Sequence, residues 1–183
     1  LGGYSISEAS SVGALMVFAF AFPRFLFAPI MGNLSDQYGR RPIILISLFG
    51  LGLDYIFHAF AWSIPVLLVG RIIAGICGAS FTTASSYIAD ISSPEKRAQN
   101  FGLIGVAFGV GFILGPVIGG LAAQISLRAP FYVATIFSLL NAGLCYFLLP
   151  ESLSKENRRK FDWSRSNPIG TLVQLKKYKK VLQ

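Results

Sequence analysis

Four ionisable residues stand inside long apolar stretches of this sequence, and they are the residues best placed to do chemistry. They are Arg24, Asp54, His58 and Arg71. A charged group at the centre of a membrane helix costs about 2.5–3.5 kcal/mol on insertion scales, so its default interpretation is functional. The chemistry open to such a set is binding and releasing a proton, or neutralising a charged group of a substrate.

Asp54 and His58 are four residues apart, which places both side chains on one face of a helix. A carboxylate and an imidazole on one face could hold or pass a proton, and the sequence does not say which of them titrates. The alternative is that both lie near the end of a helix and are simply hydrated. Arg71 is a fixed cation that favours the ionised form of a nearby acid, which can tie proton release to movement. Its alternative role is structural, as the charge partner of a buried acid.

A short charged turn separates the first two apolar runs, and it contains Gly32, Asp36, Gly39, Arg40 and Arg41. The glycines permit close approach and backbone conformations that a β-carbon would hinder. The aspartate lies among arginines, so a charge-assisted contact is available across the turn. The alternative is an ordinary turn in which two arginines only anchor one side of a membrane.

The composition predicts an all-α polytopic membrane protein. The chain has 183 residues, of which 54% are hydrophobic and 13% are charged, and its mean hydropathy is +0.61. An average soluble domain has about 25% charged residues. A membrane span needs about 20 mostly apolar residues. Five spans are predicted within residues 1–150, at about 11–31, 43–62, 66–89, 101–125 and 131–149.

The predicted fourth span is rich in glycine, with Gly111, Gly115, Pro116, Gly119 and Gly120. Glycines four residues apart form a smooth groove for close helix packing, and the proline adds a point of bending. The alternative to a functional motif is that these glycines serve general helix packing only.

Basic residues predict the orientation of the chain in the membrane, because they concentrate on the cytoplasmic side. Only Arg128 lies on the opposite side, so we expect the amino end outside and the carboxyl end inside the cell membrane. The basic residues of the predicted inner side are Arg40, Arg41, Lys96, Arg97, Lys155, Arg158, Arg159, Lys160, Arg165, Lys176, Lys177, Lys179 and Lys180. Residues 151–183 read as a basic cytoplasmic linker, with a short amphipathic helix starting near Asn167 and Pro168.

Several function classes are excluded by what the sequence lacks. Cys77 and Cys145 lie inside apolar runs and have no metal-ligand spacing, so neither a disulfide framework nor a metal site is expected. There is no Gly-Lys-Ser/Thr phosphate loop, and no nucleophile stands beside an activating base, so we expect no enzyme and no cofactor. The basic residues flank apolar spans, which makes nucleic acid a poor partner.

The turn from Gly32 to Arg41 resembles the loop signature of the major facilitator superfamily, Gly-x-Leu-x-Asp-Arg-x-Gly-Arg-Arg, with Gln37 where Arg or Lys is usual. That substitution removes one positive charge from the turn. In this resemblance, Asp90 and its neighbours form a second loop that helps hold the inner face closed. The alternative is that these are ordinary surface charges.

The resemblance extends to the drug–proton antiporters of that superfamily and, among them, to tetracycline-efflux proteins. Gly115-Pro116-x-x-Gly-Gly resembles the antiporter motif, and Asp54-Tyr55 resembles a stretch whose acid is needed for tetracycline transport. Arg71 matches the fourth-helix arginine of proton-coupled members. Arg24 departs from the glutamine common in efflux relatives, and a cation there would favour an anionic or zwitterionic substrate or pair with Asp54. The alternative is that the long Arg24 side chain only extends its charge to the membrane surface.

The resemblance implies a proton-coupled exporter of tetracyclines or other drugs, driven by a proton gradient and working by alternating access. The chain corresponds to a six-helix amino-terminal half without its first helix, followed by the central linker. Its partners would be membrane lipid, a small drug molecule, the missing first helix and the carboxyl-terminal half. The alternatives are an exporter of another drug, sugar or metabolite, or a membrane assembly subunit that transports nothing.

Overall fold

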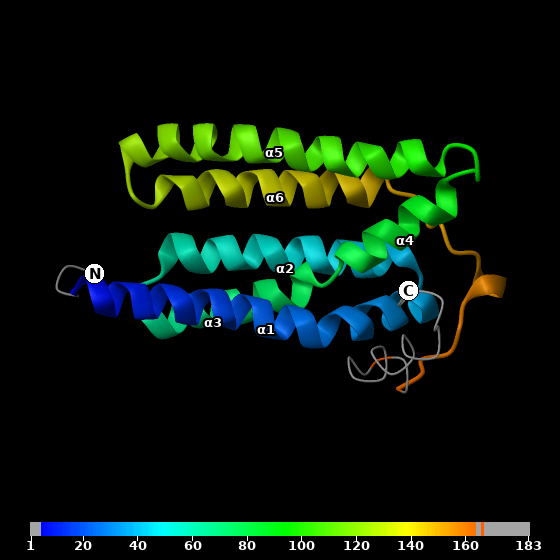
Figure 1. The fold of residues 1–183 in the computed structure, drawn as a ribbon, viewed down its shortest axis with the longest axis horizontal. Coiled ribbons are helices and arrows are strands. Elements are labelled where there is room, and N and C mark those ends of the chain that lie inside the picture. The colour runs from blue at the N-terminus through cyan, green and yellow to red at the C-terminus, as the bar shows by residue number, and fades with distance from the viewer. Residues whose placement is uncertain (1–4, 164–165, 167–183) are drawn as a thin grey trace, which may run out of the picture.

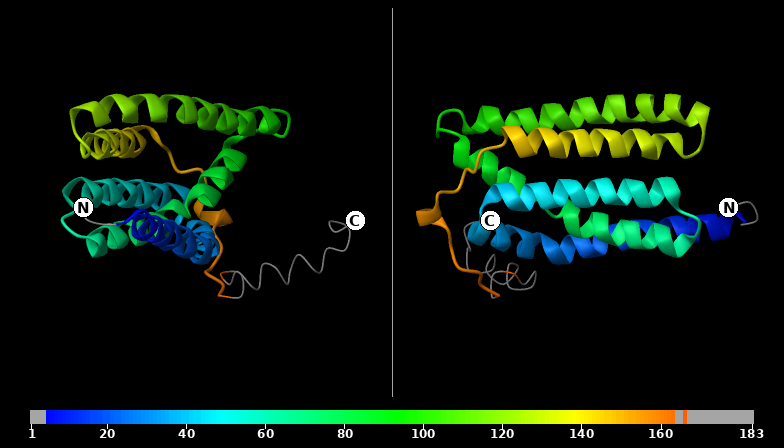
Figure 2. Two further views of the ribbon diagram at one scale, coloured as in Figure 1. Left: turned by 60° about the vertical axis from the view of Figure 1, so that its left-hand side comes forward. Right: turned by 180° about the vertical axis from the view of Figure 1, so that it is seen from behind.

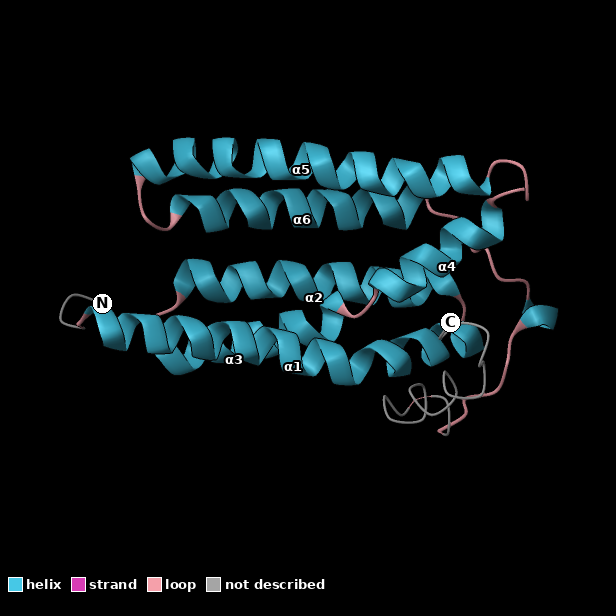
Figure 3. Ribbon diagram, in the orientation of Figure 1, coloured by secondary structure: helices cyan, strands magenta, loops and turns pink. Residues whose placement is uncertain are grey.

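The computed structural model describes residues 5–163 and residue 166, and in this part of the chain every regular element is a helix (Figure 3). Five stretches are long and apolar enough to cross a membrane, and α3 and α4 together make one of them. This confirms the prediction of an all-α protein with five spans. The elements are α1 (Ile6–Tyr38), α2 (Arg40–Phe60), α3 (Ile64–Gly78), α4 (Phe81–Ile91), α5 (Arg97–Ile125), α6 (Ala129–Leu148) and the 3₁₀ turn η1 (Lys155–Asn157).

The helices form two layers (Figures 1 and 2). One layer holds the antiparallel pair α5 and α6, and the other holds α1, α2 and α3, with α4 crossing from the second layer toward α5. Helix α2 lies at the centre, in contact with both α3 and α6. The approach of α2 to α6 is close because Gly52 has no side chain, and a β-carbon there would meet Leu139 at 3.2 Å.

The charged stretch that begins at Gly32 is helical rather than a loop. Helix α1 continues through it to Tyr38, and the turn is the single residue Gly39, with φ 109° and ψ 160°. An L-residue with a β-carbon rarely adopts that φ, so glycine is required there. Polar side chains within this stretch find partners in the helix itself, as when the Ser35 hydroxyl donates to the Gly32 carbonyl at 2.7 Å.

A further expectation about the end of a helix is wrong. Asp90 belongs to helix α4 and not to the loop after it. After α4, the Lys96 N–H bonds to the Ser93 carbonyl in a turn, and α5 begins at Arg97. In this turn, hydrogen bonds from the backbone amide of Glu95 and from the Ser93 side chain lower the pKa of the Glu95 carboxyl. The amphipathic helix predicted after Asn167 lies outside the described residues.

We call the end of the bundle where α1 ends and α2 begins the Gly39 end. The chain after α6 returns to this end and passes beside the ends of α1 and α2 (Figures 1 and 2). The opposite end carries the turn after α2, from Ala61 to Ser63, and we call it the Ala61 end.

Candidate functional site

The buried charges of α2 and α3 lie together near the Ala61 end. Asp54 is 2% exposed. Its Oδ1 is 3.0 Å from Nδ1 of His58, one helical turn further along, and its Oδ2 is 3.7 Å from Nη2 of Arg71 on the neighbouring helix. The structure therefore brings three of the four predicted residues into one cluster, the Asp54 cluster. The carboxylate is buried rather than hydrated at the helix end.

The hydrogen bonds of the Asp54 cluster determine the tautomer of His58. Nε of Arg71 donates to Nε2 of His58 at 2.9 Å. Because a guanidinium nitrogen always donates, Nε2 carries no proton, and the proton of the neutral ring is on Nδ1. Nδ1 lies 2.9 Å from the backbone carbonyl of Asp54 and 3.0 Å from its carboxylate. A second proton on the ring would have to displace Arg71 from Nε2.

Gly70 permits this arrangement. A β-carbon at Gly70 of α3 would lie 2.9 Å from Oδ1 of Asp54 and 3.1 Å from Cβ of Phe57. The absence of a side chain lets α3 approach α2 closely enough for Arg71 to reach both the carboxylate and the imidazole. Sequence reasoning did not single out this glycine, although it directly precedes Arg71.

His58 lines two pockets. One, of about 450 Å³, lies at the Ala61 end, where Trp62, Arg128 and Phe131 also line it. The other, of about 400 Å³, is bordered by Met16 and Phe20 of α1 and by Arg71. The imidazole thus borders both pockets as well as the buried carboxylate.

Arg24 is not part of the Asp54 cluster. Its guanidinium lies over the ring of Phe20, 5.6 Å from the ring centroid, and the residue is exposed. Among the described residues, Asp54 contacts the imidazole of His58 and the guanidinium of Arg71. The expected alternative that Arg24 pairs with Asp54 is therefore not realised in this conformation, and its positive charge remains available to another group.

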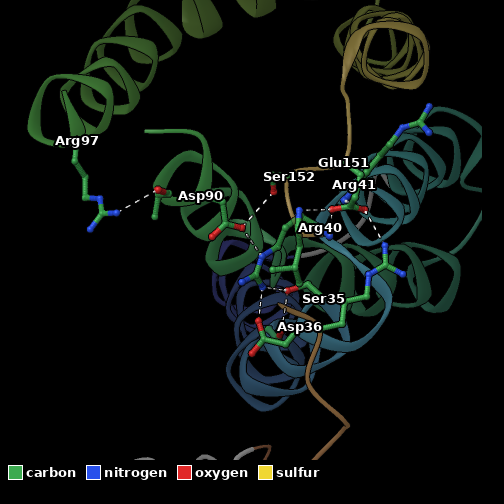
Figure 4. A network of polar contacts seen from close by, with 12 residues as sticks. Ser35, Asp36, Arg40, Arg41, Asp90, Arg97, Glu151 and Ser152 are labelled. Atoms are coloured by element: carbon green, nitrogen blue, oxygen red, sulfur yellow. Dashed lines mark hydrogen bonds and ion pairs between the residues drawn. The ribbon is translucent and has the colours of Figure 1, made fainter. Parts of the chain in front are cut away.

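A second polar cluster occupies the Gly39 end, and Arg40 is its centre (Figure 4). Its guanidinium donates from Nη1 to Asp36 at 2.5 Å and to Ser35 at 2.7 Å, and from Nε to Asp90 at 3.1 Å. The Arg40 side chain is 10% exposed. This Arg40 cluster joins the end of α1, the start of α2 and the end of α4, so a movement of one of these helices against the others must break charged contacts.

The sequence did not point to Glu151, which ties the chain after α6 to the Arg40 cluster (Figure 4). Its carboxylate accepts the backbone N–H groups of Arg40 at 2.8 Å and Arg41 at 3.3 Å, which are the first residues of α2. Ser152 donates to Asp90 at 3.2 Å. One signal in the sequence could have pointed to such a residue. The residue before α2 is Gly39, which has no side chain to cap the helix, so the cap must come from elsewhere in the chain.

The glycines of α5 face open space in the described part of the chain. A β-carbon at Gly111, Gly115, Gly119 or Gly120 would have nothing within 4 Å. A pocket of about 630 Å³ borders Gly111, Phe112 and Pro116 of the same helix. The close helix packing predicted from these glycines therefore has no partner among the described residues.

Comparisons with known proteins show what the chain is similar to. The model of the family described as Major Facilitator Superfamily matches residues 3–182. The chain is 45% identical over 168 residues to the class C tetracycline resistance protein of Escherichia coli, covering 92% of this chain and 42% of that protein. It is 40% identical over 167 residues to the class H tetracycline resistance protein of Pasteurella multocida, covering 89% and 42%.

A solved structure is also similar. The crystal structure of the human organic anion transporter MFSD10 (TETRAN) matches with a TM-score of 0.74 and 35% sequence identity, covering 86% of this chain and 37% of that one. The chain thus spans about two fifths of the length of the relatives it matches.

Proposed function

Because the chain belongs to the major facilitator superfamily of membrane transporters, we propose that it forms part of a proton-coupled exporter of drugs, with tetracyclines as the first substrate class. The observation that carries the proposal is the Asp54 cluster, a buried acid paired with His58 and Arg71 inside membrane helices. The similarity to tetracycline resistance proteins supports the substrate class. The activity is proposed for the full-length protein, in which the chain supplies one part of the transport path.

In the proposed mechanism, Asp54 is the group whose protonation is linked to transport. A proton on its carboxylate cancels the charge that holds Arg71, and a proton on Nε2 of His58 displaces Arg71 from the ring. Either event releases α3 from α2 on this face. An inward proton would drive outward movement of the drug, and each charge moved is worth about 2.3 kcal/mol per 100 mV.

The Arg40 cluster is the proposed gate at the other end of the same helix. Transporters of this type alternate by rocking of rigid helix bundles about a central site. The contacts of Arg40 with Asp36 and Asp90 would hold the Gly39 end in one state and exchange in the other. We propose that this end faces the cytoplasm, because the basic residues concentrate there.

A second candidate function is the export of organic anions. It is favoured by Arg24, an exposed cation on α1 whose described contact is the ring of Phe20. The similar human protein, MFSD10, is named an organic anion transporter. A cation beside the path would attract an anionic or zwitterionic substrate.

The test is drug accumulation in cells that express the full-length protein, measured across zwitterionic, anionic and cationic compounds. We expect reduced accumulation of tetracycline, with Arg24→Gln weakening the export of anionic compounds more than that of cationic ones. Lowered accumulation of organic anions alone would favour the second candidate. Equal accumulation of every compound with and without the protein, at confirmed membrane insertion, would contradict both.

A further inference from the structure

A pocket of about 370 Å³ lies at the Gly39 end, between α2, α6 and the chain that follows α6. Glu151 borders both this pocket and the Arg40 cluster, but neither the proposed gate nor the proposed proton site uses the pocket. Arg41 and Arg158 contribute its positive charge, Tyr146 contributes an aromatic ring, and Pro42 and Leu45 form an apolar wall. We call it the Arg41 pocket.

Both guanidinium groups in the Arg41 pocket have a buried N–H without an acceptor among the described residues. Arg41 donates from Nη2 to the Tyr146 carbonyl at 2.6 Å and lies over that ring, yet its Nε is buried and has no hydrogen-bond partner in this part of the chain. Nε of Arg158 is likewise buried and unpaired within the described ranges. Leaving a buried donor unpaired costs free energy, so two such donors beside one pocket indicate that an acceptor belongs there.

Glu151 does not neutralise these two arginines. Its Oε1 accepts the backbone N–H groups of Arg40 and Leu153, at 2.8 and 3.1 Å, and its Oε2 accepts that of Arg41 at 3.3 Å. Its ion-pair contact with Nη2 of Arg158 is long, at 4.0 Å. The carboxylate is therefore engaged by backbone donors, and two guanidinium groups face one carboxylate, which leaves the pocket with a net positive charge.

We propose that the Arg41 pocket binds the phosphodiester head group of an anionic phospholipid. Guanidinium groups bind phosphate oxygens with strong, charge-assisted hydrogen bonds. The pocket lies where two membrane-spanning helices reach their ends, which is the level of the lipid head groups, and the wall of Pro42 and Leu45 continues along α2 in the direction an acyl chain would take. A free phosphate shares the head group's chemistry but would make no use of that apolar wall.

The absence of a side chain at Gly39 leaves room for two residues of the Arg41 pocket. A β-carbon there would collide with the carboxylate of Glu151 and lie 3.0 Å from Nη2 of Arg158. The glycine that turns the chain thus also makes room for the two side chains that border the pocket. The site does not depend on the proposed transport activity, so its test needs no drug and no proton gradient.

The test is native mass spectrometry of the full-length protein with palmitoyl-oleoyl phosphatidylglycerol, and with the matching phosphatidylcholine as the neutral lipid. Arg158→Gln carries the test because Arg158 lies in the chain after α6, outside the membrane-spanning helices. Its matched control is Arg159→Gln, which removes the same charge one residue later but borders a different pocket, beside Asp36 and Asp90.

A surface arginine contributes about 1 kcal/mol to the binding of an anionic lipid, which corresponds to about fivefold in affinity. We expect the first phosphatidylglycerol to bind about fivefold more weakly to Arg158→Gln, and about 25-fold more weakly when Arg41→Gln is added, with Arg159→Gln unchanged. Equal binding by the unmodified protein and all three variants, or equal binding of phosphatidylcholine, would overturn the proposal. So would displacement of the lipid by soluble glycerol phosphate, which would identify a free phosphate site instead.

Discussion

At the scale of single residues, the contacts of the buried Asp54 carboxylate depend on Gly70 of the neighbouring helix. Asp54, His58 and Arg71 come together because Gly70 leaves no side chain between α2 and α3. Spacing along α2 was enough to predict that Asp54 and His58 share a face. It could not predict that Arg71, rather than Arg24, completes the cluster, because that depends on how the two helices approach each other.

Gly70→Ala is expected to destabilise the full-length protein by about 1–3 kcal/mol, the usual cost of adding a methyl group to a packed site. The new β-carbon would lie 2.9 Å from Oδ1 of Asp54, so α3 must move away and the contact with Arg71 must lengthen. The apparent Tm in detergent measures the change. The control is Gly32→Ala, whose β-carbon would meet Thr82 at an ordinary 3.9 Å. An unchanged Tm for Gly70→Ala would show that the approach of α3 to α2 is not tight.

At the scale of elements, α2 connects the two polar clusters. Its first residues belong to the Arg40 cluster and its last two turns carry Asp54 and His58. Because one rigid helix carries both clusters, a shift of α2 that breaks the contacts of Arg40 also moves Asp54 relative to Arg71. This gives a direct physical link between the proposed gate and the proposed proton site.

The start of α2 depends on a residue far away in the sequence. Glu151→Ala is expected to lower stability by about 0.5–2 kcal/mol, as for the loss of a helix cap, because the N–H groups of Arg40 and Arg41 lose their acceptor. Faster hydrogen exchange of the Arg40 and Arg41 amides would report the loss directly. Glu156→Ala, at an exposed acid in the 3₁₀ turn, is the matched control. Protection of these amides equal to that of the unmodified protein would contradict the capping role.

The sequence predicted the membrane-spanning helices well but not the residues at which they end. Apolar length alone predicted five spans, because the cost of exposing a polar backbone in lipid forces a helix wherever apolar residues run long enough. The ends of helices were harder to place. Helix α1 ends at Tyr38, where Gly39 turns the chain with a φ of 109°, and α5 starts at Arg97, after a turn in which the Lys96 N–H bonds to the Ser93 carbonyl.

At the scale of the whole molecule, charge placement predicts the orientation. With Cys77, Cys145 and every other cysteine of the full-length protein replaced by alanine, Leu127→Cys at the Ala61 end is expected to react with a membrane-impermeant maleimide added outside intact cells. Ser93→Cys, in the turn before α5, is expected to react only after the cells are opened. The reverse pattern would contradict the proposed orientation. Protein level and export activity of each single-cysteine variant serve as the controls for insertion.

The whole transport path could not be predicted from this chain, because the chain spans about two fifths of the length of its relatives. The sequence identified the glycine face of α5 as a packing surface, but no described residue covers it. By contrast, the contacts of Asp54 with His58 and Arg71 lie within the chain, so the proposed role of the Asp54 cluster can be tested.

The most direct test of the proposed function is tetracycline uptake by everted membrane vesicles that contain the full-length protein, under an imposed proton gradient. We predict uptake that an uncoupler abolishes and that Asp54→Asn abolishes at an unchanged level of inserted protein, because an amide cannot take up and release the coupling proton. Gradient-driven uptake that persists in Asp54→Asn would contradict the assignment of the proton site, and the absence of uptake by the unmodified, inserted protein would contradict tetracycline as the substrate.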